Sequence, residues 1–331
     1  MHSKSRISKE LSETEIRGIV RAQLGVDGEL RATLRKGGLF NTTYKIVAPS
    51  AGREWILRAG PVHREYLMGF ERNLMEAERQ VYDLFARSGV PCPVVVACDT
   101  SKTIVDRDYM ITEYIESVPL SDEAVPEAAK IALYEQAGAA AAKMHGIRGA
   151  KFGRVSDLSG GGGNESWGGY LAAHVAELGE SCLRYAVLDK PTVTRIVRLF
   201  DTNAALYAEI DTPRLVHADL WAGNVLVRPT GANGEAELAA IIDADRAIFG
   251  DVDFEFASPW MINEAFLKGY GERGEMEADR SIRIDTYKLI YYLIDTYVWK
   301  IQYDNDEEHE TNKRRMLEML DDLERRLAMR K

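Results

Sequence analysis

The chain has 331 residues, of which 46% are hydrophobic and 28% are charged, and its formal net charge is -10. This length can bury a sizeable core in one large domain or two joined ones, and the composition excludes a wholly disordered chain. An acidic surface repels the phosphate backbones of nucleic acids. We therefore expect no nucleic-acid partner, and a surface that attracts cationic small molecules.

The cysteines and the apolar segments indicate the compartment. Cys92, Cys98 and Cys182 have no C-x-x-C spacing, which is typical of reduced thiols in a reducing compartment. The N-terminal segment mixes charges throughout and has no apolar run of the kind found in secretory signals. The most apolar late segment, residues 289–299, is short and is interrupted by Asp295. These patterns predict a cytoplasmic protein with no membrane span.

Residues 1–115 predict a small lobe built on one antiparallel sheet. Ser12 and Glu15 have the spacing of a capping box, and a short amphipathic helix is expected after them. A second, main helix is expected at residues 72–87, where Ser88 and Gly89 end it. Alternating or continuous apolar runs predict five strands, at residues 30–34, 42–47, 54–58, 94–97 and 109–114.

Residues 116–331 predict a larger and mostly helical lobe. Helical periodicity is found at residues 126–145, 167–178, 193–209 and 282–299, with a strand-rich stretch at residues 215–243 between them. A β-rich lobe followed by a helical lobe indicates an α+β fold of two lobes with a cleft between them.

One segment carries the clearest chemical pattern. An apolar strand leads into His217 and Asp219, a tight loop follows, and Asn224 comes five positions after Asp219, before another apolar strand. A later strand ends at Asp243. Taken singly, these residues have ordinary structural explanations, because an isolated aspartate often caps a turn. Their joint order and spacing match the H-R-D-x-x-x-x-N loop of protein kinases.

Phosphoryl transfer from a nucleotide requires this set of groups. One carboxylate must orient the acceptor hydroxyl and take its proton, while an amide and a second carboxylate hold Mg²⁺ against the phosphates. We therefore predict Asp219 as the catalytic base and Asn224 and Asp243 as metal ligands.

The segment His217-Ala-Asp-Leu-Trp-Ala-Gly-Asn224, with Ile242-Asp243-Ala-Asp245 and Phe249-Gly250-Asp251, resembles the aminoglycoside phosphotransferase and choline kinase superfamily. That superfamily commonly shows H-G-D-x-x-x-x-N, then I-D-x-x, then G-D-x-x-x-D-L-A. The resemblance implies a protein-kinase-like bilobal fold with a five-stranded β lobe, and ATP (with GTP as the alternative) used with Mg²⁺. It also implies phosphorylation of a hydroxyl on a small molecule. Two positions depart from the pattern: Glu255 replaces the usual aspartate, with Asp253 as a nearby substitute, and Phe40 replaces a serine that often contacts phosphate.

The resemblance assigns a nucleotide-positioning loop to residues 36–43. Gly37 and Gly38 would let the backbone approach the phosphates, and Asn41, Thr42 or Thr43 could donate hydrogen bonds. Without the resemblance, two glycines between strands indicate only a hairpin turn.

Two further features complete the expected nucleotide site. Arg58 occupies the place of the phosphate-binding lysine of kinases, and Glu78 on the following helix could pair with it, although an ordinary surface pair is the alternative. Backbone groups of Glu113 and Ile115 would bind the adenine edge with Thr112 at the back, although the same residues also suit a plain buried strand.

The acceptor is left open by the sequence. Acidic candidates for binding a cationic acceptor are Asp285, Asp295, Asp304, Asp306, Glu307 and Glu308, although residues 304–310 also suit a solvated charged stretch. Trp260, Tyr291, Tyr292 and Trp299 could form an aromatic wall or could simply pack in the core.

Three functions follow from these observations. The first is an aminoglycoside-type antibiotic kinase. The second is a metabolic kinase for a sugar, fructosamine-like or choline-like acceptor, because Leu220-Trp221 is reminiscent of fructosamine kinases. The third is a catalytically silent pseudokinase, against which the intact Asp219, Asn224 and Asp243 argue. The oligomeric state is not indicated by the sequence.

Overall fold

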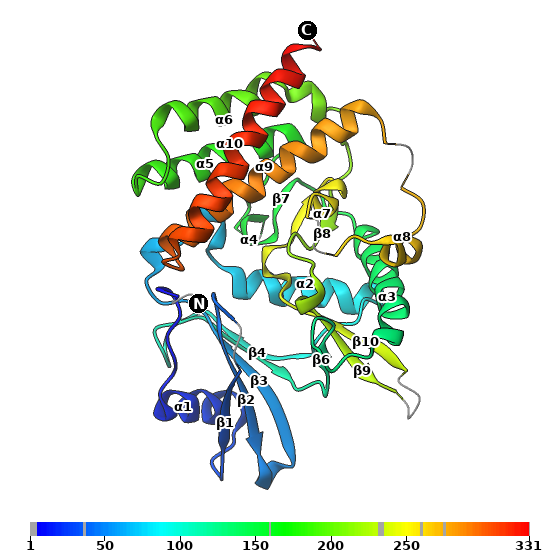
Figure 1. Cartoon of the computed structure of the whole chain (residues 1–331). Coiled ribbons are helices and arrows are strands. Elements are labelled where there is room, and N and C mark those ends of the chain that lie inside the picture. Colours follow the sequence, from blue (N-terminus) through cyan, green and yellow to red (C-terminus); the bar gives the residue numbers. More distant parts are fainter. Residues whose placement is uncertain are drawn as a thin grey trace.

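The computed structural model of the protein describes residues 5–35, 38–158, 160–230, 235–258, 261–273 and 276–330. A five-stranded sheet with helix α1 (Glu13–Leu24) lies at one end of the molecule, and the longer helices gather at the other end (Figure 1). Helix α2 (Leu74–Ser88) crosses between these two parts. The predicted α+β arrangement of a small β lobe and a larger helical lobe is confirmed.

The sheet of the small lobe has the strand order β1-β2-β3-β5-β4, and every neighbouring pair is antiparallel. All five predicted strands are present, with ends within a residue or two of those expected. Their bounds are β1 (Arg31–Arg35), β2 (Thr42–Ala48), β3 (Arg53–Ala59), β4 (Val95–Asp99) and β5 (Tyr109–Glu113). The register places Thr43 opposite Arg58 and therefore brings the loop before β2 beside that arginine.

Strand alternation divides the two faces of this sheet between two helices. In β5, Tyr109 and Ile111 pack in a cluster with α1, whereas Met110 packs in a cluster with α2. Helix α1 begins at the predicted capping box of Ser12. Helix α2 ends at Gly89, whose φ of 69° lets it close the last turn without a side-chain clash.

Two small sheets of the large lobe hold the segments with the catalytic pattern. One contains β6 (Val118–Pro119), β9 (Val225–Pro229) and β10 (Ala236–Ile241), and the other contains β7 (Gly153–Arg154), β8 (Arg214–Val216) and β11 (Ile248–Gly250). The loop with Asp219 joins β8 to β9, and Asp243 follows β10. Neighbouring strand ends thus bring these two carboxylates together.

Helices form the rest of the large lobe. They are α3 (Glu127–His145), α4 (Val155–Leu158), α5 (Trp167–Arg184), α6 (Lys190–Thr202), α7 (Asp253–Phe256), α8 (Glu264–Tyr270), α9 (Ala278–Ile301) and α10 (Asp306–Ala328). The predicted helix at residues 193–209 is shorter, because α6 ends at Asn203 and a 3-10 turn follows. Helix α10 was not predicted, and it packs along α9 with Met316, Leu320 and Leu323 buried.

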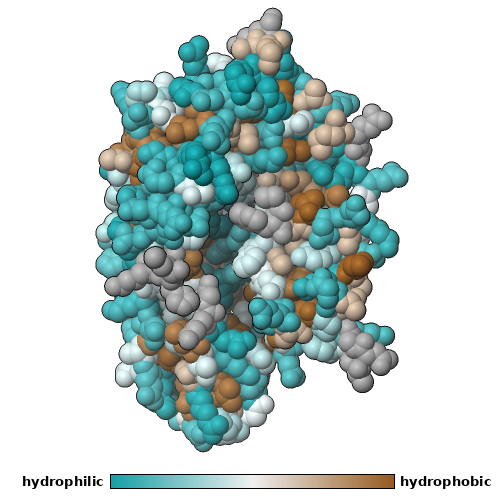
Figure 2. Space-filling model, viewed as in Figure 1, coloured by the Kyte–Doolittle hydropathy of each residue, from teal (hydrophilic) through white to brown (hydrophobic). Residues whose placement is uncertain are grey.

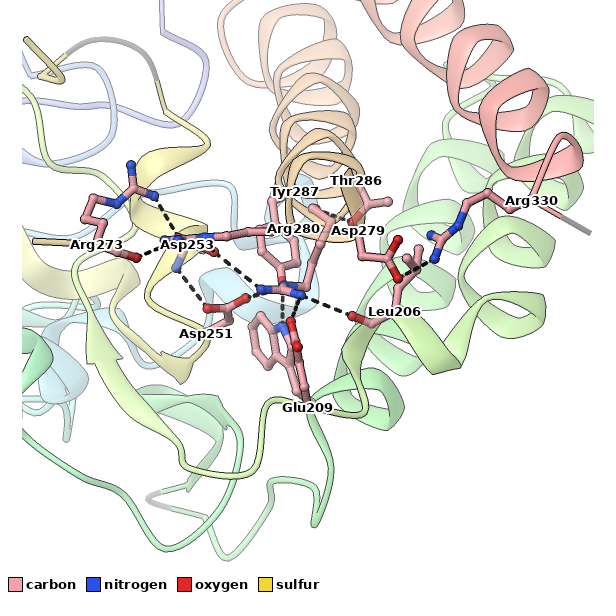
Figure 3. Close-up of polar contacts among 12 residues, drawn as sticks. Leu206, Glu209, Asp251, Asp253, Arg273, Asp279, Arg280, Thr286, Tyr287 and Arg330 are labelled. Atoms are coloured by element: carbon pink, nitrogen blue, oxygen red, sulfur yellow. Dashed lines mark hydrogen bonds and ion pairs between the residues drawn. The ribbon is translucent and has the colours of Figure 1, made fainter. Parts of the chain in front are cut away.

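A network of arginines and aspartates fixes α7 against α9 (Figure 3). Arg283 donates to Asp251 at 2.9 Å, and Arg280 and Arg273 donate to Asp253 at 2.7 and 2.8 Å. Both aspartates are at most 4% exposed, and buried charges are tolerated only when they are paired in this way. Asp253 therefore helps to hold α7 in place through its ion pairs.

None of the helices in the described ranges is both long enough and apolar enough to cross a membrane.

Candidate active site

The loop between β8 and β9 is braced by the side chain of His217. Its Nε2 lies 2.9 Å from the carbonyl oxygen of Ile242, and its Nδ1 accepts the backbone N–H of Asp219 at 3.3 Å. Between them, Ala218 has a φ of 64°, which is uncommon for a residue other than glycine. The histidine therefore holds a strained turn that presents Asp219.

Glu255 of α7 supports the same loop from below. Its carboxylate accepts the backbone N–H groups of His217 and Ala218 at 2.8 and 3.2 Å, and it lies 3.5 Å from Nε2 of His145. Burial raises the pKa of Glu255, but the hydrogen bond from His145 and the charges of His145 and His217 hold it below its ordinary value. The ionised carboxylate thus serves both N–H groups.

Asp219 and Asn224 contact each other across the loop. The amide nitrogen of Asn224 donates to the carbonyl of Asp219 at 2.8 Å and to its Oδ2 at 3.3 Å. The pKa of Asp219 is raised to about 6. Burial is the largest cause and the charge of Asp243 acts in the same direction, while Arg246 and His217 lower the pKa. A carboxylate with a pKa close to neutral is suited to take a proton from a substrate hydroxyl.

Asn224 and Asp243 fit a magnesium site. Because the nitrogen of Asn224 is bound to Asp219, its amide oxygen is the atom left for a metal. Asp243 follows β10 with a φ of 58°, and its N–H donates to the hydroxyl of Tyr82 at 3.2 Å. Mg²⁺ in proteins takes hard oxygen ligands, commonly one or two carboxylates together with substrate phosphates. The donor set present here therefore suits Mg²⁺ brought with a nucleotide.

Arg58 pairs with Glu78 on α2 and with Asp243 in the large lobe. Its Nη1 donates to both oxygens of Glu78 at 2.5 Å, and its Nη2 forms an ion pair with Oδ1 of Asp243. Burial disfavours the cation, but Asp243 and Glu78 raise the pKa of Arg58 well above its ordinary value. Glu78 is fully buried and also accepts the hydroxyl of Tyr82 at 2.5 Å. The predicted Arg58–Glu78 pair is formed, and it is not a surface pair.

A cavity of about 360 Å³ lies between the sheet and the large lobe. Thr112, Glu113 and Ile115 line it at one end, and Arg58, Asn224 and Asp243 line it at the other. Ile56 of β3 and Leu226 of β9 are also part of its wall. The residues predicted to bind adenine and the predicted metal ligands thus line one cavity, which has a volume typical of small-ligand pockets.

The loop before β2 lies over this cavity and over a second one. A side chain at position 38 would bring its Cβ to 2.8 Å from the carbonyl oxygen of Asn41, so the loop requires glycine there. Gly38 and Thr43 line both cavities, and Asn41 lines the second. Thr42 lines neither, because its hydroxyl donates to the carbonyl of Lys9 at 2.9 Å, and its predicted phosphate contact is not supported. Lys36 and Gly37 lie outside the described residues.

The second cavity, of about 450 Å³, extends from Asp219 toward the end of α9. Arg58, Trp221, Asn224 and Asp243 line both cavities, so the two meet beside Asp219. In Figure 2 a hollow with a mostly hydrophilic rim opens between the two lobes. The smaller cavity can thus hold a nucleotide and the larger one an acceptor, with Asp219 and Asp243 beside the place where the two cavities meet.

The acidic candidates for acceptor binding separate into two groups. Asp295 is half-buried on α9, and burial raises its pKa to about 7, with Asp219 and Glu308 contributing in the same direction. Asp304 and Asp306 instead form surface ion pairs with Arg6 and Lys300. Asp285 pairs with Lys288 and Arg326, between α9 and α10.

The aromatic candidates separate in the same way. Trp299 lines the second cavity, as predicted for one wall of an acceptor site. The hydroxyl of Tyr291 donates to the carbonyls of Ala218 and Phe254, so this ring belongs to the core. Trp260 lies outside the described residues. Tyr303 and Arg246 also line the cavity, and sequence reasoning missed both.

The phosphotransferase enzyme family matches residues 31–284 of this sequence. The chain belongs to the phosphotransferase enzyme family. It is thus an enzyme that transfers a phosphoryl group to the hydroxyl of a small molecule. No curated protein sequence matches the chain.

Solved structures with the same fold include aminoglycoside phosphotransferases and a choline kinase. The aminoglycoside phosphotransferase APH(4)-Ia is 20% identical with a TM-score of 0.64, and the similarity covers 93% of this chain and 98% of that one. APH(2")-IIia, solved with GDP and kanamycin, is 16% identical with a TM-score of 0.60 over 95% and 99% of the two chains. A choline kinase from Cryptosporidium parvum is 14% identical with a TM-score of 0.57 over 94% and 96%. At these identities the similarity shows the kinase-like fold alone.

Proposed function

We propose that this phosphotransferase is a Mg²⁺-dependent kinase that transfers the γ-phosphoryl group of a nucleoside triphosphate to a hydroxyl of an amine-bearing small molecule. The observation that carries this proposal is the position of Asp219, which lies where the two cavities meet. Asn224 and Asp243 lie on its nucleotide side. The charge of Asp219 also contributes to raising the pKa of Asp295 on α9.

The geometry supports an in-line transfer. The acceptor hydroxyl binds in the larger cavity and gives its proton to Asp219 as its oxygen forms a bond to the γ-phosphorus. The bond from that phosphorus to the bridging oxygen breaks, and the nucleoside diphosphate leaves with the electron pair. Arg58 binds the phosphates, and Asn224 and Asp243 hold Mg²⁺, which when bound neutralises charge on the nucleotide oxygens.

An acceptor with an amine is favoured by the charge and shape of the larger cavity. Trp299 and Tyr303 line the larger cavity together with Asp219, with their rings 5.3 Å apart. The charges of Asp219 and Glu308 both raise the pKa of Asp295 on the same helix as Trp299, so negative charge accumulates beside this wall. A carboxylate beside aromatic faces is suited to an ammonium group. We therefore place aminoglycoside-type acceptors first and amine-bearing metabolites, such as fructosamine-like or choline-like alcohols, second.

A substrate panel tests this function. Purified protein is incubated with Mg²⁺ and either ATP or GTP, together with aminoglycosides, amino sugars, choline or neutral sugars, and phosphorylated acceptors are detected by mass spectrometry. We expect transfer to amine-bearing acceptors, loss of transfer in Asp219→Asn, and unchanged transfer in the exposed control Asp201→Asn. Nucleotide binding without transfer to any acceptor would instead support the pseudokinase. Transfer to neutral sugars alone would overturn the amine-bearing class.

A further inference from the structure

Arg246 is a partly buried cation in the wall of the larger cavity. It ends the 3-10 turn Ala244–Arg246, directly after the metal-ligand candidate Asp243, and its side chain is 22% exposed. It lines the 450 Å³ cavity together with Asp219 and Tyr303. The sequence pattern assigned it no role.

The guanidinium is held by a carboxylate from a distant part of the chain. Nη2 of Arg246 donates to Oε1 of Glu71 at 3.1 Å. The other oxygen of Glu71 accepts the backbone N–H of Met68 at 2.9 Å and the side-chain amide of Gln302 at 2.5 Å. Glu71 is 2% exposed and Gln302 is fully buried, so the anchor of the arginine is itself fixed.

Aromatic rings and a second arginine restrict Arg246 further. Its guanidinium carbon lies 5.7 Å from the centre of the Phe70 ring and 5.8 Å from that of Phe40. Nη1 of Arg154 bonds to the carbonyl oxygen of Arg246 and holds its backbone. A cation restrained in this way needs no reorganisation when charge develops beside it.

The neighbouring carboxylates keep Arg246 charged, and some of its guanidinium N–H donors remain for a ligand. Burial disfavours the cation, but Glu71 and Asp219 raise its pKa above the ordinary value. Within the part of the chain that the structure describes, Glu71 is the hydrogen-bond partner of the guanidinium, and the bond uses a donor on Nη2. The other N–H donors of the planar fork remain for a ligand in the cavity.

Phosphoryl transfer in the larger cavity would be favoured by a cation beside Asp219. The transferring group carries negative charge on its equatorial oxygens, and on its acceptor side it faces the carboxylate of Asp219. Arg58 and the metal ligands lie toward the nucleotide, where the smaller cavity begins. Arg246 is the arginine that lines the larger cavity without also lining the smaller one, among the described residues.

We propose that Arg246 is a catalytic residue whose guanidinium binds the phosphoryl group during its transfer, and that Glu71 and Gln302 are positioning residues for it. This inference rests on the proposed kinase function. Arg246 neither gives nor takes a proton. It stabilises the group while the bond to the acceptor oxygen forms and the bond to the nucleotide breaks.

The first experiment compares steady-state kinetics of Arg246→Gln and Arg246→Lys. We expect kcat to fall about 100-fold or more in the glutamine variant and less in the lysine variant, which keeps the charge but loses the fork. The KM for nucleotide should stay within about threefold in both, because ground-state binding depends on other groups. Arg195→Gln is the matched control, because Arg195 forms surface ion pairs on α6 with Asp321 and Glu324.

The second experiment measures binding without turnover. Nucleoside diphosphate with Mg²⁺ and aluminium fluoride mimics the planar phosphoryl group, and its affinity is measured by calorimetry against that of the diphosphate with Mg²⁺ alone. Aluminium fluoride should raise the affinity of the wild type for the diphosphate about 100-fold. Arg246→Gln should lose most of this gain in affinity while it binds the diphosphate alone normally. A residue with a purely structural role would not separate the two affinities.

Glu71→Gln tests the positioning role. The amide keeps a hydrogen-bonding group beside Met68 and Gln302 but removes the charge that anchors the guanidinium. We expect kcat to fall by roughly tenfold, with a matching loss of the fluoride-dependent gain and unchanged diphosphate binding. Unchanged kcat in this variant would remove Glu71 from the proposal.

The outcomes separate the two proposals. If the wild type phosphorylates an acceptor and Arg246→Gln retains both kcat and the fluoride-dependent affinity, Arg246 has no catalytic role. If Arg246→Gln raises only the KM for the acceptor, the arginine binds the acceptor and not the phosphoryl group. If the glutamine variant fails to fold by thermal melting, the lysine variant decides by the same two measurements. If the wild type transfers phosphate to no acceptor, it is the proposed function that has failed.

Discussion

Two arginine–carboxylate clusters in the large lobe use the same chemistry for different ends. Around Asp251 and Asp253, three arginines satisfy two carboxylates, and Tyr287 donates to Asp251 at 2.8 Å, so the cluster is closed (Figure 3). Around Asp219 and Asp243, the arginines are anchored on one side by Glu78 or Glu71 and line cavities on the other.

The difference shows in the pKa values of Asp253 and Asp219, although burial and the charge of Asp253 raise the pKa of Asp251. Burial raises the pKa of Asp253, but Arg280 and Arg273 pull it below its ordinary value, because they bond to it directly. Burial raises the pKa of Asp219 to about 6 against the lowering effect of Arg246, and among the described residues no arginine forms a hydrogen bond with this carboxylate. A closed cluster stabilises the fold, whereas incompletely paired charges are held ready for a substrate. The predictions below would break or sharpen this distinction.

The largest effect is expected at the catalytic carboxylate. Asp219→Asn removes the proton acceptor and should lower kcat by about 10³-fold or more. Because it also removes a buried carboxylate whose pKa is raised, the free energy of unfolding should stay the same or increase. Rapid-quench kinetics and urea unfolding measure the two quantities. A large loss of stability would place Asp219 with the closed cluster instead.

The closed cluster should show the reverse behaviour. Asp253→Asn removes the buried carboxylate that Arg273 and Arg280 share and should cost about 3–5 kcal/mol of unfolding free energy. Because the pKa of Asp253 is lowered in the folded state, its stabilisation is present above the unfolded pKa and is lost as the pH falls below about 4. Urea denaturation at several pH values measures this, with Asp201→Asn as the exposed control. A change below about 1 kcal/mol would contradict the account.

A metal-dependent effect is expected next. Asp243→Asn should raise the Mg²⁺ concentration needed for half-maximal nucleotide binding roughly tenfold, because a neutral amide is a weaker ligand for a hard cation. Fluorescence titration with a nucleotide analogue at varied Mg²⁺ tests this without turnover. If the variant binds the Mg²⁺–nucleotide normally, the metal ligand must be another residue, with Asp245 as the nearest carboxylate.

The smallest effect concerns the acceptor and pH. Burial raises the pKa of Asp295 to about 7, while Asp219 and Glu308 raise it and Arg246 and Arg315 lower it. Above that pH the carboxylate is ionised and binds a cationic acceptor, and below it the KM for the acceptor should rise by up to about tenfold per pH unit. Asp295→Asn should give a KM that is higher and independent of pH in this range. An unchanged pH dependence in that variant would exclude Asp295 from acceptor binding.

Much of the fold follows from local sequence signals, and the errors also have local causes. The five strands and the cap at Ser12 were predicted because alternation and capping chemistry are read from neighbouring residues. Helix α10 was not predicted, although Met316, Leu320, Leu323 and Leu327 repeat at helical spacing, because the charged residues before them favour a solvated stretch. Thr42 was grouped with Thr43, although adjacent residues of a strand point to opposite faces.

The candidate site was predictable where its residues share one continuous motif. Asp219 and Asn224 are five positions apart, and their spacing alone indicates a shared task. Glu71 lies 175 positions before Arg246 and 231 before Gln302, and the three meet because the end of α9 and the segment before α2 pack together. Only the folded structure brings them into contact, so the anchored arginine could not be found from a motif.

The most direct test of the central claim is a single-turnover measurement of phosphoryl transfer from saturating Mg²⁺–nucleotide to an amine-bearing acceptor. The wild type and Asp201→Asn should form phosphorylated acceptor at the same rate. Asp219→Asn should bind the nucleotide with normal affinity and form product about 10³-fold more slowly. Equal rates in Asp219→Asn and the wild type would contradict the assignment of Asp219 as the catalytic base.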